Sequence, residues 1–131
     1  MKPFADLFQT ADWKNEKHSP AIEVPERVKK GEDFQVKVTV GKEIPHPNTT
    51  EHHISWIEVY FLPQGGRFPF QIGRFEFTAH GESTEGPNTS TVYTKPEVVL
   101  FFRTEKPGTI YAFSYCNIHG LWANQIELVV E

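Results

Sequence analysis

Short runs of alternating apolar and polar residues, separated by glycine and proline, constrain the fold of this chain most strongly. Phe34, Val36, Val38 and Val40 alternate with polar residues, the period-two pattern of a strand with one buried face. Residues 53–62 are richer in β-branched and aromatic side chains, which is typical of a central strand. Ten prolines and nine glycines are enough to end many short elements. The pattern therefore predicts a chain built mainly from strands.

Further strand patterns occur at residues 68–77, 90–94, 97–103, 109–115 and 125–130. In the first of these segments the apolar phase slips by one residue at Gly73, which predicts a β-bulge. About seven short strands predict an all-β fold, an immunoglobulin-like antiparallel β-sandwich. Phe4, Leu7 and Phe8 are spaced as in a helix, so we expect one short N-terminal helix over residues 3–12.

The length and charge of the chain exclude several classes of protein. We expect residues 1–131 to form a single domain, because this length supports one core. The net charge of −4 provides no basic surface for a nucleic acid. No apolar run approaches the roughly 20 residues that a membrane span needs, and the acidic first residues do not form a signal peptide. Since the one cysteine, Cys116, cannot form an intrachain disulfide, we expect a cytoplasmic protein.

Six histidines stand beside this single cysteine, and that balance raises the question of a bound metal. Cys116 and His119 follow a predicted strand, so a thiolate and an imidazole can turn toward one point. His46 lies between two prolines that restrict its backbone, and His52 follows six residues later. His18 lies in another loop limited by proline. These five residues are the candidate metal ligands.

The remaining two histidines are left outside this set. His53 neighbours His52 but points to the opposite face of the strand if the strand has begun. His80 is expected to cap a turn or to bond the backbone. A lone thiolate with several imidazoles suits iron or copper better than structural zinc, which usually takes more cysteine. The pattern thus favours a redox metal.

Three motifs, in this order along the chain, resemble the superoxide reductases. They are Glu16-Lys17-His18-Ser19-Pro20, then His46-Pro47 with His52 and the segment Ile54 to Glu58, then Cys116-Asn117-Ile118-His119-Gly120-Leu121-Trp122. The resemblance covers nearly the whole chain. It is to the short, single-iron class, also called neelaredoxin, because the four cysteines of the extra rubredoxin-like domain of desulfoferrodoxin are absent.

This resemblance implies an oxidoreductase that reduces superoxide to hydrogen peroxide without releasing oxygen, as a defence against oxidative stress. It implies a mononuclear non-haem iron that alternates between Fe2+ and Fe3+. The equatorial ligands that it implies are His18, His46, His52 and His119. It implies the Cys116 thiolate as the axial ligand, whose sulfur we expect to accept hydrogen bonds from backbone N–H groups that follow it.

The first motif carries two further residues of the implied site. By resemblance, Lys17 attracts the superoxide anion and hydrogen-bonds the developing peroxide, and Glu16 becomes an iron ligand at the sixth position once the metal is ferric. The resemblance also implies a transient one-electron donor such as rubredoxin, and assembly as a homotetramer.

Two other functions stay open from the residues alone. Cys116 and His119 at a strand end also resemble cupredoxins, blue-copper electron-transfer proteins that use one thiolate, two imidazoles and often an axial methionine. The only methionine here is Met1, and two well-placed histidines would go unused. A non-catalytic immunoglobulin-like binding module would leave the Cys-x-x-His motif unexplained.

Overall fold

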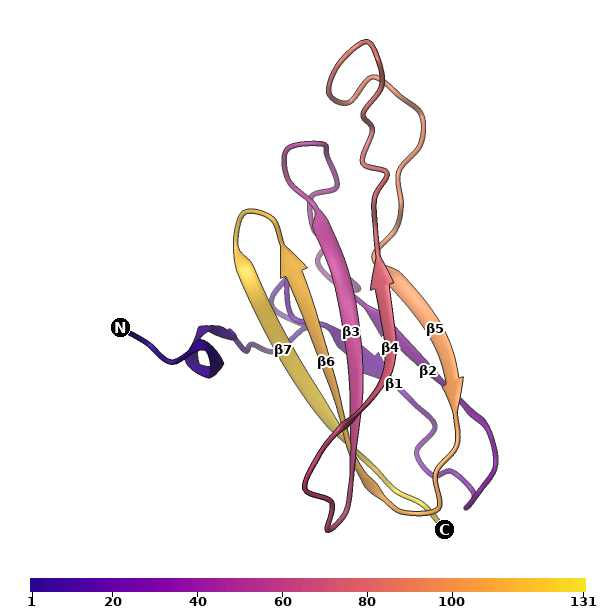
Figure 1. The fold of residues 1–131 in the computed structure, drawn as a ribbon. Helices are drawn as coiled ribbons and strands as arrows, with labels where there is room; N and C mark the ends of the chain where they lie inside the picture. Colours follow the sequence, from indigo (N-terminus) through magenta and orange to yellow (C-terminus); the bar gives the residue numbers. More distant parts are fainter.

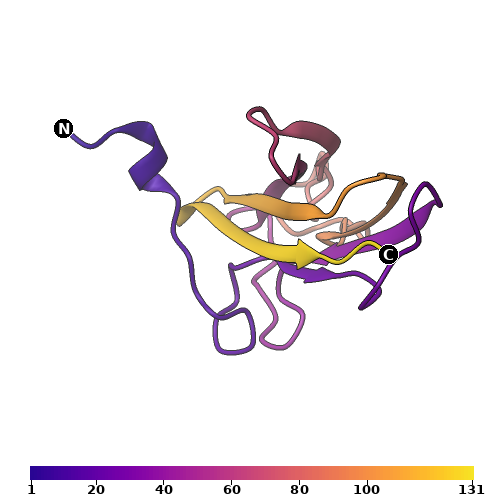
Figure 2. The ribbon, with the colours of Figure 1, turned by 90° about the horizontal axis from the view of Figure 1, so that it is seen from below.

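Seven strands and one short helical turn make up the computed structural model, which describes residues 1–131. The strands are β1 Ala21–Glu23, β2 Phe34–Thr39, β3 Ile54–Pro63, β4 Phe70–Glu76, β5 Glu97–Phe102, β6 Gly108–Cys116 and β7 Gly120–Leu128. They form two antiparallel sheets with the strand orders β1-β2-β5 and β4-β3-β6-β7 (Figure 1). Figure 2 shows the sheets as two layers, with the N-terminal segment projecting to one side. The predicted all-β sandwich is confirmed.

The hydrophobic core fills the space between the two sheets. Val36 and Val38 of β2 face Ile57 and Val59 of β3 and Ile110 of β6 within one cluster, and none of these side chains is exposed. Because successive side chains of a strand point to opposite faces, β6 buries every second residue, and β2 does so from Phe34 to Val38. Complete burial of one such side chain stabilises the fold by about 1.5–3 kcal/mol. The core therefore fixes the strand ends, where the candidate ligands lie.

A bulge interrupts the pairing of β3 with β4. Val59 pairs with Gly73, whereas Tyr60 pairs with Gln71, so Ile72 has no partner on β3. The predicted bulge is thus confirmed, with the unpaired residue directly before Gly73.

Other predictions of secondary structure are wrong. Residues 90–94 form no strand, and only an isolated bridge joins Tyr93 to His80. The N-terminal helix is a 3-10 turn, η1, over Phe4–Leu7 rather than 3–12, and because none of its residues is buried, no packing sustains a longer helix. β7 begins at Gly120, before the predicted residue 125. No helix here has the length and apolar character that crossing a membrane requires.

One end of the sandwich collects the segments that carry the candidate ligands. β6 ends at Cys116, which pairs with Ile54 at the start of β3 and with Gly120 at the start of β7. The connection between β2 and β3, residues 40–53, emerges at this same end (Figure 1). The connection between β4 and β5, residues 77–96, also emerges at this end and extends beyond the other loops (Figure 1).

Candidate metal centre

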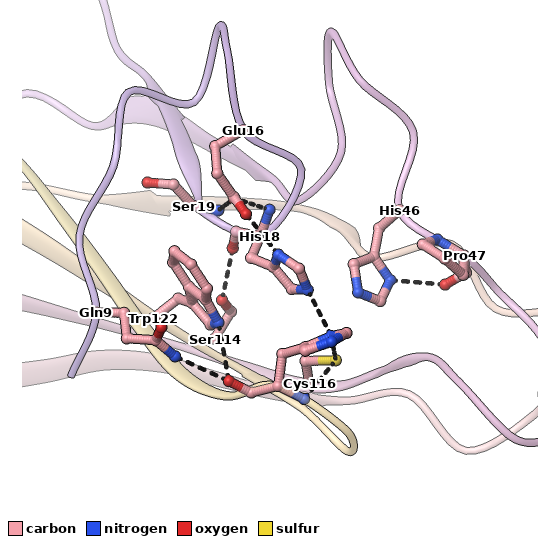
Figure 3. A network of polar contacts seen from close by, with 10 residues as sticks. Gln9, Glu16, His18, Ser19, His46, Pro47, Ser114, Cys116 and Trp122 are labelled. Atoms are coloured by element: carbon pink, nitrogen blue, oxygen red, sulfur yellow. Dashed lines mark hydrogen bonds and ion pairs between the residues drawn. The ribbon is translucent and has the colours of Figure 1, made fainter. Parts of the chain in front are cut away.

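The five candidate ligands converge at this end of the sandwich from three separate parts of the chain. The potential donor atoms of His18, His52, Cys116 and His119 all lie within 4.8 Å of one another. His46 lies outside that group, but its ring adjoins the rings of His18 and His52. Figure 3 shows His18 and His46 near the Cys116 sulfur. The structure therefore brings together all five residues that the spacing singled out.

The four imidazoles form a closed ring of neighbours. The distances between ring centroids are 4.7 Å from His18 to His46, 4.8 Å from His46 to His52, 5.0 Å from His52 to His119 and 4.9 Å from His119 to His18. Adjacent rings are inclined to one another by between 57° and 82°. Sides of nearly equal length are what four ligands around one ion would produce.

Cys116 lies beside this ring at the end of β6, and its side chain is fully buried. Its sulfur accepts a hydrogen bond from the backbone N–H of His119 at 3.3 Å, which confirms the expected bond to sulfur, and lies 3.8 Å from His119 Nδ1. The tight turn that brings His119 back is possible because Gly120 adopts a positive φ of 83°. The β6–β7 hairpin thus sets the positions of both candidate ligands.

In His18 and His46, a hydrogen bond at Nδ1 determines which ring nitrogen remains free to bind a metal. Nδ1 of His18 donates to the Glu16 carboxylate at 2.6 Å, and Nδ1 of His46 donates to the Pro47 carbonyl at 2.6 Å (Figure 3). Each neutral imidazole therefore keeps its lone pair on Nε2, the atom that can bind a metal. Nε2 of His18 lies 3.1 Å from Nδ1 of His119.

Two of the free nitrogens are buried without any partner. Nε2 of His46 and Nε2 of His52 are inaccessible to solvent and make no hydrogen bond. An unsatisfied buried polar atom costs about 1–3 kcal/mol, so a protein seldom keeps two of them close together. A cation that accepts both lone pairs removes this cost. The residues present therefore fit a bound metal ion.

The electrostatic surroundings keep these two histidines neutral. Burial lowers the pKa of His46 to about 4, helped by the nearby charges of His18, His52 and Lys17 and opposed by the Pro47 carbonyl. Burial also lowers the pKa of His52, and Lys17 contributes to that shift as well. Neutral imidazole is the form that binds a metal.

Glu16 lies in the loop that carries His18. Its carboxylate accepts the backbone N–H of His18 and, at 3.0 Å, that of Ser19, in addition to the bond from His18 Nδ1. Burial acts to raise the pKa of Glu16, but the hydrogen bonds from His18 and Ser19 outweigh it and the pKa is lowered. In this structure Glu16 orients His18. Its role as an iron ligand stays a prediction.

Two residues that the sequence left without a role also hold His18. The Trp122 ring stacks on the His18 ring at 4.7 Å and 11°, and its Nε1 donates to the His119 carbonyl. Ser114 donates from Oγ to the His18 carbonyl at 3.1 Å (Figure 3). Ser114 is fully buried on the core side of β6. The sequence held one signal for the role of Ser114: it is a polar residue at a position that the strand alternation predicts to be buried.

The two histidines that were set aside are found next to each other. The His53 and His80 rings stack in parallel, with 3.5 Å between centroids and 3° between planes. His80 is buried and its Nε2 donates to the Phe77 carbonyl at 2.7 Å, which confirms the expected bond to the backbone. Neither residue belongs to the group of donor atoms.

Comparison with known proteins agrees with this geometry. The family model described as desulfoferrodoxin matches residues 10–125. The superoxide reductase of Pyrococcus furiosus is 59% identical over 95% of this chain and 98% of its own, and the neelaredoxin of Megalodesulfovibrio gigas is 56% identical over 96% and 97%. A solved structure of the reduced superoxide reductase (neelaredoxin) from Archaeoglobus fulgidus has a TM-score of 0.88 and 62% identity, over 94% of this chain and 98% of that one.

The matched region contains all five candidate ligands and the loops that carry them. The fold agrees over nearly the full length of both chains, not only around the site. Incidental histidines on a binding module would not converge in this way. The chain therefore belongs to the desulfoferrodoxin family.

Proposed function

We propose that this protein is a superoxide reductase, an oxidoreductase that combines superoxide with one electron and two protons to give hydrogen peroxide. The observation that carries the proposal is the ring of four imidazoles beside a buried cysteine sulfur. The activity named for the Pyrococcus furiosus relative, at 59% identity, supports it.

We propose iron as the metal. The residues that would hold it are His18, His46, His52, His119 and Cys116. One thiolate with four imidazoles suits iron, whereas a blue-copper site would use only two of these imidazoles. A bound iron alternates between Fe2+ and Fe3+ and so supplies the single electron.

The residues around the site have separate tasks in this reaction. The Cys116 thiolate is an electron-rich donor, and the His119 N–H bonded to its sulfur moderates that donation. Lys17 brings a positive charge to the site of a chain whose net charge is −4. Two unit charges 4 Å apart attract by about 4 kcal/mol near a protein surface. Lys17 therefore attracts superoxide and donates a hydrogen bond to its oxygen.

The electron must come from another molecule. Cys116 is the only cysteine in the sequence and is a proposed iron ligand, so no cysteine remains for a second, rubredoxin-like iron centre. We propose a rubredoxin-type donor that docks transiently over a small surface. The absence of any disulfide supports a reducing compartment such as the cytoplasm.

The assembly and domain organisation are part of the same proposal. We propose that residues 1–131 form one catalytic domain, since strands from both halves of the chain share one core. We propose a homotetramer, supported by the half-buried aromatic residues Trp56, Tyr60 and Phe113 on the outer face of β3 and β6.

The decisive experiment is anaerobic loading with Fe2+, followed by metal analysis, absorption spectroscopy and rapid mixing with superoxide. We expect one iron per chain, a thiolate-to-iron absorption band in the oxidised protein, and one peroxide formed per superoxide. Stoichiometric copper, or no bound iron, would contradict the proposal. Oxygen released at half the amount of superoxide consumed would identify dismutation instead.

A further inference from the structure

Residues 46–53, which carry His46 and His52, have little regular backbone structure of their own. Their backbone-to-backbone hydrogen bonds are limited to Thr49 N–H with the His52 carbonyl and Asn117 N–H with the His53 carbonyl. A loop with so few internal bonds does not fix two side chains by itself. Other contacts must therefore determine where His46 and His52 lie.

The Asn117 side chain of the β6–β7 turn supplies two of these contacts, to Glu51 and His53, and the β4–β5 connection supplies the others through side chains. Thr50 donates from Oγ1 to the His80 carbonyl at 2.8 Å, and Asn48 donates from Nδ2 to the Thr94 carbonyl at 2.9 Å. The Asn88 side chain accepts the Thr50 N–H at 2.9 Å. Asn88 is the only non-glycine residue with positive φ, at 56°, a conformation that asparagine tolerates better than most residues.

His80 lies at the centre of this junction. Its ring stacks on His53, the residue directly after His52, with 3.5 Å between centroids. Its Nε2 donates to the Phe77 carbonyl at 2.7 Å, which fixes the orientation of the ring. His53 is fixed in turn by donating from Nδ1 to the Thr49 carbonyl at 2.9 Å. One buried ring thus packs against the end of the ligand loop that follows His52.

We propose that His80 is a positioning residue for the metal site: its stack on His53 holds residues 46–53 so that His46 and His52 face the other ligands. The inference rests on the proposed function for the identity of the ligands. It assigns a role to the β4–β5 connection, which itself contributes no ligand.

The test compares His80→Ala with Ser83→Ala, a matched change in the same connection. Ser83 is exposed and bonds only to residues of its own turn, through Thr89 and Glu85. In competition with a chelator for Fe2+, we expect His80→Ala to lose affinity by about 10-fold or more and Ser83→Ala by less than about twofold. Equal affinities of the two variants would overturn the proposal.

Hydrogen exchange of the metal-free protein gives a readout that does not depend on iron or activity. In His80→Ala we expect the Thr49 amide to exchange about 10-fold faster or more, with the amides of Ser114 and Tyr115 in β6 unchanged. Unchanged exchange at Thr49, or equal acceleration at all three amides, would contradict a positioning role. Failure of the wild-type chain to bind iron would instead contradict the proposed function.

Two milder variants keep the test usable if His80→Ala does not fold. His80→Phe retains a ring that can stack on His53 and removes the polar contacts. Asn88→Gly removes an exposed side chain without straining the positive φ. We expect both to fold, to accelerate exchange at Thr49 and to lower Fe2+ affinity by a smaller factor than His80→Ala. Wild-type behaviour of both variants would overturn the proposal.

Discussion

The metal site has two halves that are held in place by different means. The hairpin half, His18, Cys116 and His119, is attached to paired strands: Cys116 is part of β6, and Ser114 holds the backbone of His18. The loop half, His46 and His52, lies outside any strand. Side-chain contacts with the β4–β5 connection and hydrogen bonds with Asn117 of the β6–β7 turn fasten it.

Because of this difference, displacing the hairpin half costs more free energy than displacing the loop half. Displacing the hairpin half requires breaking the ladder between β6 and β7 and disturbing the core, so its movements cost much of the global free energy of unfolding. The loop half can shift by losing a few partly exposed hydrogen bonds, each worth about 0.5–1.5 kcal/mol. We therefore expect changes at the hairpin half to alter the chemistry and changes at the loop half to alter metal affinity.

We expect the largest effect from a substitution in the hairpin half. Cys116→Ser replaces the thiolate by a hydroxyl, and we expect the thiolate-to-iron band to disappear and superoxide reduction to fall by about 100-fold or more. His46→Ala in the loop half should weaken iron binding but keep the band, because the thiolate remains. Absorption spectra and stopped-flow rates of both variants check this contrast. A Cys116→Ser protein that retains the band and the rate would remove Cys116 as a ligand.

A pair of glycines offers a matched comparison of the two halves. Gly41 and Gly120 both have a φ of 83°, so alanine costs about 1 kcal/mol or more of backbone strain at either position. A Cβ on Gly41 would lie 2.7 Å from the backbone nitrogen of His46, whereas one on Gly120 meets nothing within 4 Å. Gly41→Ala must therefore displace His46.

We expect Gly41→Ala to lower Fe2+ affinity by about 10-fold and Gly120→Ala by much less, although both lower the free energy of unfolding. Chelator competition and denaturant unfolding measure the two quantities. If Gly120→Ala weakened iron binding as much as Gly41→Ala, the hairpin half would not be the more rigid of the two.

The same contrast explains what the sequence could predict. Alternation in residues 34–40 and 109–115 reflects burial of one strand face, so the sandwich and the position of Cys116 were predictable. The five candidate ligands were found because they lie beside prolines or at the ends of predicted strands, and both features can be recognised in the sequence. The contact of His80 with residues 46–53 was not predictable, because it joins segments that no local pattern relates. Residues 90–94 failed as a strand because their backbone pairing is confined to hydrogen bonds with Ala79 and Gly81 around one isolated bridge.

A smaller effect is expected at Lys17, whose charge acts on His46 and His52 in the loop half. Lys17→Ala should slow the reaction with superoxide by about 10-fold and flatten its dependence on salt, with iron content unchanged. Lys14→Ala is the control, because that exposed ammonium lies over the Trp13 ring, 5.6 Å from its centroid. Stopped-flow rates at several ionic strengths provide the measurement. Equal rates for the two variants would assign Lys17 a surface role only.

The smallest effect concerns acid and the loop half. Burial lowers the pKa of His80 below its usual 6.5, and the charge of His53 adds to this, while the Phe77 carbonyl and the Glu82 carboxylate oppose it. As the pH falls below about 6.5, the unfolded chain binds a proton at His80 before the folded protein does, so stability is complete above that pH and declines below it. Between about pH 7.5 and pH 5.5 we expect metal-free wild type to lose more unfolding free energy than His80→Phe, by less than about 1 kcal/mol. Denaturant unfolding at both pH values measures this difference, and identical losses would show that His80 does not make the loop half sensitive to acid.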